Sequence, residues 1–310
     1  MDWRLSVVSP GSELVQLAAL ATQLAPERPY SADELEHAGR TYPGGERWLA
    51  WAGARPVGYA TVGRIYVYAP DFDGAWGEIG VVDDFRRRGI GGELYRLISI
   101  HAAAMGKVAL HVPACDARPE AIGWLERRGF TEIERSHSLA LDLRGVDVPA
   151  VDAPADVEIT TLAARPDLLD ALYDVSDATS GDIPGSAVPH TAGTFEEWVA
   201  YDVDGPMARR EAIFIALVDG EIAGYASLCV PGADPTTAWH DMTGVMPAFR
   251  GRGIAGALKR SAIVWAAANG FVRLETENNV GNAPMRAINA ALGYAPLPDQ
   301  IILRGPLADL

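Results

Sequence analysis

A turn rich in arginine and glycine occurs twice in this chain. Residues 85–92 read FRRRGIGG and residues 249–256 read FRGRGIAG. Each turn follows an apolar, strand-like segment and precedes a helix-like one. Glycine lets the backbone approach a ligand without a side-chain clash, and the first N–H groups of a helix have no intrahelical partners. With arginines added, such a turn is typical of a site that binds phosphate.

The repeat extends beyond the turn. At the same offset, Gly106 matches Gly270 and Gly129-Phe130 matches Gly293-Tyr294, and with a shift of two residues VGYAT (57–61) resembles AGYAS (223–227). A repeat of this length indicates one domain present twice. We therefore expect an N-terminal domain over residues 1–145 and a C-terminal domain over residues 157–310. Residues 146–156, which contain Pro149 and Pro154, are expected to link them.

Both halves show the same order of elements, β-α-α-β-β-β-α-β-α-β. Ser12 is a candidate N-cap of a first helix, and Ser31 with Glu34 forms a capping box for a second one. Asp219-Gly220 is the tight-turn pair of a hairpin. The fold class is therefore α/β, with a mixed sheet covered by helices on both faces. Residues 130–143 and 300–304 are expected to close the sheets of their own halves.

The glycines Gly251, Gly253 and Gly256 also fit the dinucleotide-binding pattern G-x-G-x-x-G, with Glu275 at the expected distance. That fingerprint belongs in the first strand-to-helix turn of a domain, whereas this turn follows four expected strands. The first copy also breaks the spacing. What both copies share is Arg-x-x-Gly-x-[Gly/Ala].

Arg-x-x-Gly-x-[Gly/Ala] between a strand and a long helix resembles the pyrophosphate loop of the GNAT N-acetyltransferase superfamily. The order of elements agrees over nearly the whole of both halves. The chain is similar to the tandem GNAT proteins of actinobacteria, a group that includes mycothiol synthase. The resemblance implies two acyl-CoA N-acyltransferase domains, acetyl-CoA as co-substrate, and direct attack by an amine in a ternary complex. It also implies that one half can be degenerate.

In the C-terminal half the resemblance extends to the stretch ETENNVGNAPMRAINAALGY (275–294), which is similar to an asparagine-rich signature of many GNAT sequences. It places Thr276, Met285 and Asn289 near the coenzyme. Asn282 also suits the N-cap of a helix, so both roles stay open for it. The residues expected to bind the coenzyme are Val245, Met246, Arg250, Gly251, Arg252, Gly253, Ile254, Ala255, Gly256, Asn278 and Asn282, with Arg88, Gly89 and Gly91 as candidates in the N-terminal half.

Acetyl transfer needs a base that removes a proton from the amine. Asp241 and then His240, on the strand before the second turn, are the first candidates, followed by Glu275 and Glu277. Glu78 is the counterpart in the first half. Many GNAT enzymes carry a tyrosine as the acid for the departing thiolate. That place holds Asn289 in one half and Leu125 in the other.

We expect catalysis in the C-terminal half, because it keeps the asparagine signature and the more acidic composition. Nine acidic residues lie in 167–204, with no lysine or arginine between them. Such a field would attract a cationic amine.

The net charge of −15 argues against nucleic acid as a partner. No apolar run approaches the ~20 residues that span a bilayer, and the N-terminal residues do not resemble a signal peptide. Cys115 and Cys229 lie far apart, with no metal-like spacing. A cytoplasmic acetyltransferase that acts on a small amine is therefore expected, with no metal. A non-catalytic module that binds acyl-CoA is the alternative.

Overall fold

The computed structural model describes residues 2–145, 150–185 and 188–309, and they form two compact units. Unit 1 comprises Met1–Glu134 together with Gln300–Leu310, and unit 2 comprises Arg135–Asp299. Residues 146–149 of the expected linker lie outside the described residues. Within those residues, no helix is both long and apolar enough to cross a membrane.

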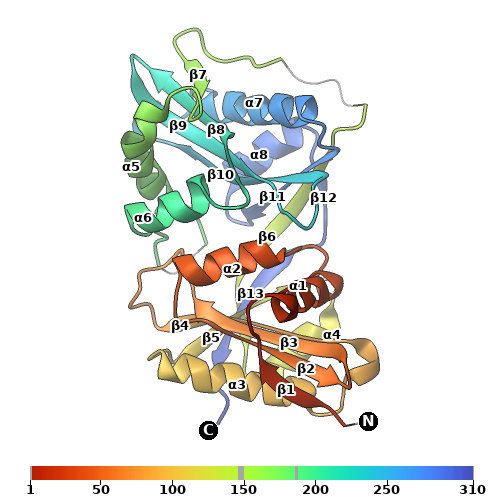
Figure 1. The fold of residues 1–310 in the computed structure, drawn as a ribbon. Helices are drawn as coiled ribbons and strands as arrows, with labels where there is room; N and C mark the ends of the chain where they lie inside the picture. The colour runs from red at the N-terminus through yellow and green to blue at the C-terminus, as the bar shows by residue number, and fades with distance from the viewer. Residues whose placement is uncertain (1, 146–149, 186–187, 310) are drawn as a thin grey trace. The chain divides into compact units, whose positions relative to one another are not determined.

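Unit 1 is a six-stranded mixed sheet with helices on both of its faces (Figure 1). Neighbouring strands are antiparallel except for the parallel pair β4 and β5. In their order across the sheet, the strands are β1 (Arg4–Val7), β2 (Glu46–Ala52), β3 (Arg55–Arg64), β4 (Gly74–Val81), β5 (Ala109–Cys115) and β13 (Gln300–Pro306). The helices are α1 (Ser12–Leu24), α2 (Ala32–Thr41), α3 (Ile90–Ala104) and α4 (Pro119–Glu126), and a short 3₁₀ turn, η1 (Asp83–Phe85), precedes α3.

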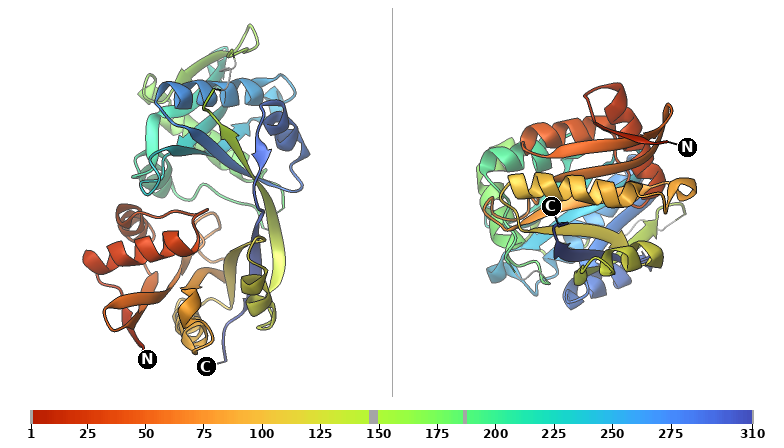
Figure 2. Two further views of the ribbon diagram at one scale, coloured as in Figure 1. Left: turned by 90° about the vertical axis from the view of Figure 1, so that its right-hand side faces the viewer. Right: turned by 90° about the horizontal axis from the view of Figure 1, so that it is seen from below.

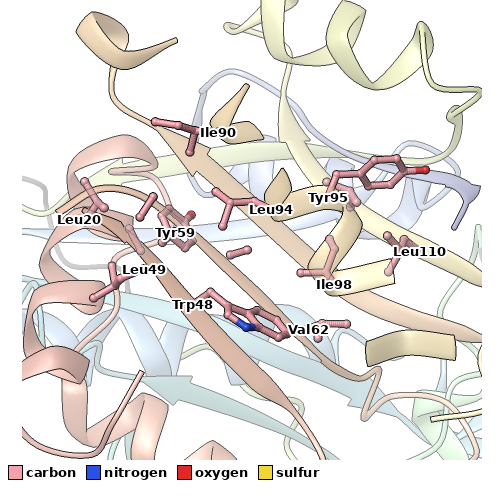
Figure 3. Packing of buried hydrophobic residues seen from close by; sticks show 14 of the residues in the cluster. Leu20, Trp48, Leu49, Tyr59, Val62, Ile90, Leu94, Tyr95, Ile98 and Leu110 are labelled. Atoms are coloured by element: carbon pink, nitrogen blue, oxygen red, sulfur yellow. The ribbon is translucent and has the colours of Figure 1, made fainter. Parts of the chain in front are cut away.

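The core of unit 1 lies where α3 packs on the sheet. Ile90, Leu94 and Ile98 recur every four residues, so they share one face of α3, and all three are buried. Figure 3 shows them over Val62 of β3 and Leu110 of β5. This packing fixes the first turn of α3 against β4, which is where the arginine-rich turn arrives.

Unit 2 repeats this architecture. Its strands, in their order across the sheet, are β7 (Glu158–Thr161), β8 (Ala208–Val218), β9 (Glu221–Cys229), β10 (Thr237–Val245), β11 (Arg273–Asn279) and β6 (Thr131–Asp142), and β12 (Ala295–Pro296) pairs with β6. Its helices are α5 (Leu169–Ser180), α6 (Phe195–Trp198), α7 (Ile254–Ala268) and α8 (Ala283–Ala291), with the short helical turns η2 (Pro166–Leu168), η3 (Val199–Val203) and η4 (Pro247–Phe249). The parallel pair is β10 and β11, so the consecutive elements β-α-β-α, with the two strands parallel, occur in both units.

The two halves of the sequence exchange their last strands. β13, from the end of the chain, pairs antiparallel with β5 of unit 1, and β6 pairs antiparallel with β11 of unit 2. Figures 1 and 2 show β13, in blue, beside β5 of unit 1. The expectation that residues 130–143 and 300–304 close their own sheets is therefore wrong, and the compact units differ from the expected domains 1–145 and 157–310. Because both strands come from one repeated element, either can pair with either edge.

Local signals in the sequence agree with the structure at several element ends. Ser31 and Glu34 form the expected capping box, and Asp219 and Gly220 adopt positive φ in the hairpin turn. Ser12 is the first residue of α1, whose N-cap position is Gly11, so the expected cap at Ser12 is wrong.

Candidate functional site

The two arginine-rich turns have the same backbone geometry. Gly89 and Gly253 occupy the N-cap positions of α3 and α7 in the left-handed region, with φ of 87° and 82°. Arg86 Nε donates to Val81 O (3.1 Å), and Arg250 Nε donates to Val245 O (2.9 Å). Each first arginine is thus anchored to the end of the preceding strand, and the free N–H groups of the next helix turn follow it.

The second position of the turn differs between the copies. Arg87 has φ of 59°, and Gly251 has φ of 75°. A non-glycine residue in this region is uncommon, and the left-handed conformation costs roughly 1–2 kcal/mol relative to glycine. Arg87 makes no ion pair with another described residue, so no internal contact of its side chain compensates for this cost.

Both parallel strand pairs splay apart before the turns. Within the described residues, β4 pairs with β5 only over Gly74–Trp76, although β4 continues to pair with β3 as far as Val81. In unit 2, β10 and β11 pair from Thr237 to His240, and β10 continues along β9 to Val245. Each splay leaves backbone groups of two facing strand edges available for an extended ligand.

The splay of unit 1 opens into a cavity of about 820 Å³. It is lined by the arginine-rich turn, the diverging parts of β4 and β5, helix α4 and the segment after α1. A Cβ at Gly92, in the first turn of α3, would meet no atom within 4 Å, so this glycine leaves open space there. The size and lining are those of a site for a large coenzyme with an anionic end.

A buried carboxylate lies in the same cavity. Glu78 of β4 is 7% exposed, and its Oε1 accepts hydrogen bonds from Tyr30 Oη (2.9 Å) and Trp76 Nε1 (3.0 Å). Its Oε2 accepts no hydrogen bond from the described residues. Burial and the charge of Glu78 raise the pKa of Tyr30 well above its ordinary value, so Tyr30 stays a neutral donor. The arrangement holds one carboxylate oxygen fixed and leaves the other free.

The arginines of the two turns differ in their ion pairs. In unit 2, Arg250 pairs with Asp182 and Arg252 pairs with Asp156. In unit 1, Arg86 lies 2.8 Å from Asp83 and 3.6 Å from Glu120.

Arg88 points away from the cavity of unit 1, because it donates to Asp84 O (2.8 Å) and lies over the Phe85 ring. Gly89 and Gly91, by contrast, line the cavity as a coenzyme site would require.

The asparagines of unit 2 have structural roles. Asn282 caps α8 by accepting from Met285 N (3.3 Å). Asn289 is fully buried and donates to Asn278 Oδ1, whereas its own Oδ1 has no partner among the described residues. The cap contact agrees with one of the two roles left open for Asn282, and nothing in the structure tests the other. Val245 and Met246 are half-buried at the end of β10.

His240 lies on the helix α7 face of the unit 2 sheet. Its two ring nitrogens are buried without hydrogen-bond partners among the described residues, and its ring lies 6.0 Å from that of Tyr294. Burial lowers its pKa well below the ordinary value, and the charge of Lys259 adds to this effect. A buried imidazole with a lowered pKa and no hydrogen-bond partner among the described residues does not favour the expected role as a base.

Asp241 lies at a β-bulge of β10, and its carboxylate is 3.5 Å from Ser227 Oγ. The side chain of Asp241 is partly accessible to solvent, but many protein atoms lie around its carboxylate. The resulting loss of hydration raises the pKa of Asp241. Burial, with the charge of Asp241, raises the pKa of Asp202 well above its usual range. These two carboxylates form an acidic site in unit 2.

The acidic segment of unit 2 is partly neutralised. Asp167, Asp182 and Asp204 pair with Arg165, Arg250 and Arg210, all of which lie outside 167–204. The negative potential of the segment is therefore weaker than its sequence alone suggests.

In each unit two parallel strands splay apart, and an arginine-rich turn at the start of a helix follows the first of them. This arrangement is typical of the acyl-coenzyme A transferases to which the sequence resemblance points. A family model described as Acetyltransferase (GNAT) family matches residues 13–130 and again residues 172–294. The chain belongs to this family and carries two copies of its domain in tandem, and it is an acetyltransferase. The expected fold class is thereby confirmed.

Two solved structures cover nearly the whole chain. A GCN5-related N-acetyltransferase from Sphaerobacter thermophilus superposes with a TM-score of 0.75 at 17% identity, over 98% of this chain and 96% of that one. A tandem GNAT protein from the clavulanic acid biosynthesis pathway also gives 0.75, at 20% identity, over 100% of both chains. At this identity they show the fold. In sequence, the aminoglycoside N(6')-acetyltransferase type 1 of Klebsiella aerogenes is 28% identical over 115 residues, which are 35% of this chain and 76% of that protein.

Sequence analysis missed part of the unit 1 site. It named Glu78 but not Tyr30 or Trp76, which fix its carboxylate. Trp76 and Glu78 are two apart on a strand, so they share one face, and this spacing could have been used. Tyr30 lies 48 residues away in a loop, and no local pattern connects it to β4.

Proposed function

We propose that the chain is an acetyl-CoA-dependent N-acetyltransferase whose acceptor is a small, cationic amine. The observation that supports this best is the unit 1 cavity, because it joins an anion-binding turn to a buried carboxylate along two splayed strands. The residues present fit the coenzyme. The turn and the first N–H groups of α3 suit its diphosphate, and the open edges of β4 and β5 suit its extended amide arm.

When bound, the coenzyme supplies the acetyl group as a thioester. Arg86 and Arg87 line the cavity at the anionic end, and their guanidinium groups can add charge-assisted hydrogen bonds. Backbone N–H groups on the open edge of β4, near Val81, are the candidate donors to the thioester oxygen as it becomes negative. The unit 2 counterpart of this position is Val245.

Glu78 is the proposed general base of unit 1. An amine is protonated near neutral pH and must lose a proton to attack the thioester carbon. Oε2 of Glu78 can take this proton, directly or through one water, because this oxygen accepts no hydrogen bond from the described residues. Tyr30 and Trp76 hold the carboxylate in place while it does so. As the new C–N bond forms, the C–S bond breaks and the coenzyme leaves as a thiol or thiolate.

A cationic acceptor is supported by charge. The buried carboxylate of Glu78 can pair with an ammonium group, and the chain as a whole carries a net charge of −15. The relative from Klebsiella aerogenes is named for an aminoglycoside, a polycationic amine. Aminoglycosides are therefore the first class of acceptor to test.

The placement of catalysis in the C-terminal half, with Asp241 as base, stays a prediction and competes with the proposal above. Two observations support unit 1 instead. The carboxylates of Asp182 and Asp156 already occupy the arginines of the unit 2 turn. A coenzyme diphosphate would have to displace both of them, whereas in unit 1 Arg86 is paired with Asp83 and Glu120 but Arg87 makes no ion pair with the described residues.

A non-catalytic module that binds acyl-CoA is the second candidate. It is favoured by Leu125 and Asn289, which stand where many relatives carry a tyrosine acid. Leu125 is buried and apolar, and the amide of Asn289 is engaged with Asn278. Neither side chain can deliver a proton to a departing thiolate.

An assay of thiol release from acetyl-CoA over a panel of amines tests the proposal. The panel contains an aminoglycoside, a linear polyamine, a neutral hexosamine and an amino acid, and mass spectrometry identifies the acetylated product. We expect release that depends on the amine, with the highest kcat/KM for the polycations. Coenzyme binding without turnover of any amine would favour the non-catalytic module. Absence of binding would contradict both candidates.

A further inference from the structure

The cavity of unit 1 contains a second cationic site besides the arginine-rich turn. Arg127 and Arg128, just after α4, both line it. Neither makes an ion pair with a carboxylate of the described residues. Burial lowers the pKa of Arg128, and the positive charge of Arg127 adds to this effect. Two like charges held side by side at a cavity favour an anion between them.

Direct contacts connect this site to the turn. The guanidinium carbon of Arg128 lies 3.6 Å from the ring centroid of Trp124. A Cβ placed on Gly91, in the first turn of α3, would lie 3.5 Å from Cζ2 of the same indole. Trp124 therefore bridges Arg128 and the helix start that is expected to hold the diphosphate, and all three residues line one cavity.

The internal repeat shows that the site is particular to unit 1. At the same offset, Trp124, Arg127 and Arg128 correspond to Ile288, Ala291 and Leu292. Unit 2 keeps the arginine-rich turn but has neither the aromatic bridge nor the two charges. The fold and the turn do not require them, since unit 2 forms both without them.

We infer that Arg127 and Arg128 bind the 3'-phosphate on the ribose of the coenzyme and so select coenzyme A thioesters over their 3'-dephospho counterparts. This inference rests on the proposed function, because it assumes that the diphosphate lies at the turn. A diphosphate there is matched by Arg86, Arg87 and the N–H groups of α3. The remaining anionic group of the coenzyme is the 3'-phosphate, which is attached to the nucleoside next to the diphosphate.

Titration calorimetry with acetyl-CoA and with acetyl-3'-dephospho-CoA tests the inference. The wild type is expected to bind acetyl-CoA at least about tenfold more tightly, as charge-assisted hydrogen bonds to one phosphate imply. The double variant Arg127→Gln/Arg128→Gln is expected to bind both compounds within about twofold of each other. Its affinity for the dephospho compound is expected to equal that of the wild type. The matched control Arg40→Gln/Arg96→Gln removes two charges of unit 1 outside the cavity and should keep the preference.

Two outcomes would overturn the inference while leaving the proposed function intact. The wild type could bind both compounds equally, or the double variant could lose affinity for both to the same extent. An equal loss of affinity for both compounds would mean that Arg127 and Arg128 either bind the diphosphate or stabilise the fold. The thermal unfolding midpoint of the double variant distinguishes these two causes. If the wild type bound neither compound, the proposed function would fail with the inference.

Discussion

Replacement of Glu78 by glutamine is the sharpest test of the proposed chemistry. Glutamine has nearly the shape of glutamate, and its amide oxygen can still accept from Tyr30 Oη and Trp76 Nε1. The amide nitrogen then stands in the place of Oε2. That nitrogen donates hydrogen bonds and cannot take a proton, so the variant removes the base and keeps the contacts that position it.

The expected magnitudes follow from these contacts. Two hydrogen bonds are weakened rather than lost, so the free energy of unfolding should fall by no more than about 1 kcal/mol. Loss of a general base lowers the rate by about 10²–10⁴-fold, which corresponds to about 3 to 5 kcal/mol in the activation free energy. The coenzyme should bind with unchanged Kd, because Glu78 is not part of the arginine-rich turn.

The assay compares kcat/KM for thiol release in Glu78→Gln and in Asp241→Asn, with Kd for acetyl-CoA measured on both. Asp241→Asn is the matched control, because it makes the same chemical change at the competing site of unit 2. We expect loss of turnover in the first variant and nearly full activity in the second. The opposite pattern, with Kd unchanged in both, would refute the role of Glu78 and place the base in the C-terminal half.

Three further predictions follow from particular residues. Arg87→Gly should leave the free energy of unfolding unchanged or raise it by up to about 1 kcal/mol, because the φ of 59° at this position suits glycine. The same variant should bind acetyl-CoA several-fold more weakly. An unchanged Kd would show that the Arg87 side chain does not contact the coenzyme. Burial lowers the pKa of Lys259 to about 7 from its ordinary 10.5. Between these values the unfolded chain binds more protons, so stability should rise with pH across this window, and urea titrations of Lys259→Met should show a smaller rise. A chain that ends at Asp299 lacks β13, so it should lose the acetyl-CoA binding of unit 1, whereas retained binding would contradict the strand exchange.

The turn and the helix behind it could be predicted because their signals are local. Gly89 and Gly253 adopt the left-handed conformation that their position at a helix start requires, and the same eight-residue pattern gives the same backbone twice. The hairpin at Asp219-Gly220 is equally local. Such features depend on a few neighbouring residues, so the sequence alone specifies them.

The exchange of β6 and β13 could not be predicted in this way. Both strands come from one repeated element, and both pair antiparallel with the parallel strand that precedes them in the sheet order. Nothing in either segment distinguishes the edge of β5 from the edge of β11. The choice depends on how the whole chain is connected.

The ion pairs of the two turns could not be predicted from the sequence pattern either. Arg250 and Arg252 look equivalent to Arg86 and Arg88 in the repeat. Their partners Asp182 and Asp156 lie 68 and 96 residues away, and only the folded chain brings them together. The spacing of the arginines indicates that a turn can bind phosphate. The folded structure shows which of these arginines are already paired with carboxylates of the chain.

In the proposed function the coenzyme binds in unit 1, at the arginine-rich turn that precedes α3. Titration calorimetry with acetyl-CoA on Arg86→Gln/Arg87→Gln and on Arg250→Gln/Arg252→Gln is the direct test, since each variant removes two arginines from one of the two turns. We expect the first variant to lose the binding heat of the wild type and the second to keep it with an unchanged Kd. Loss of binding in the second variant alone would show that the coenzyme binds in unit 2.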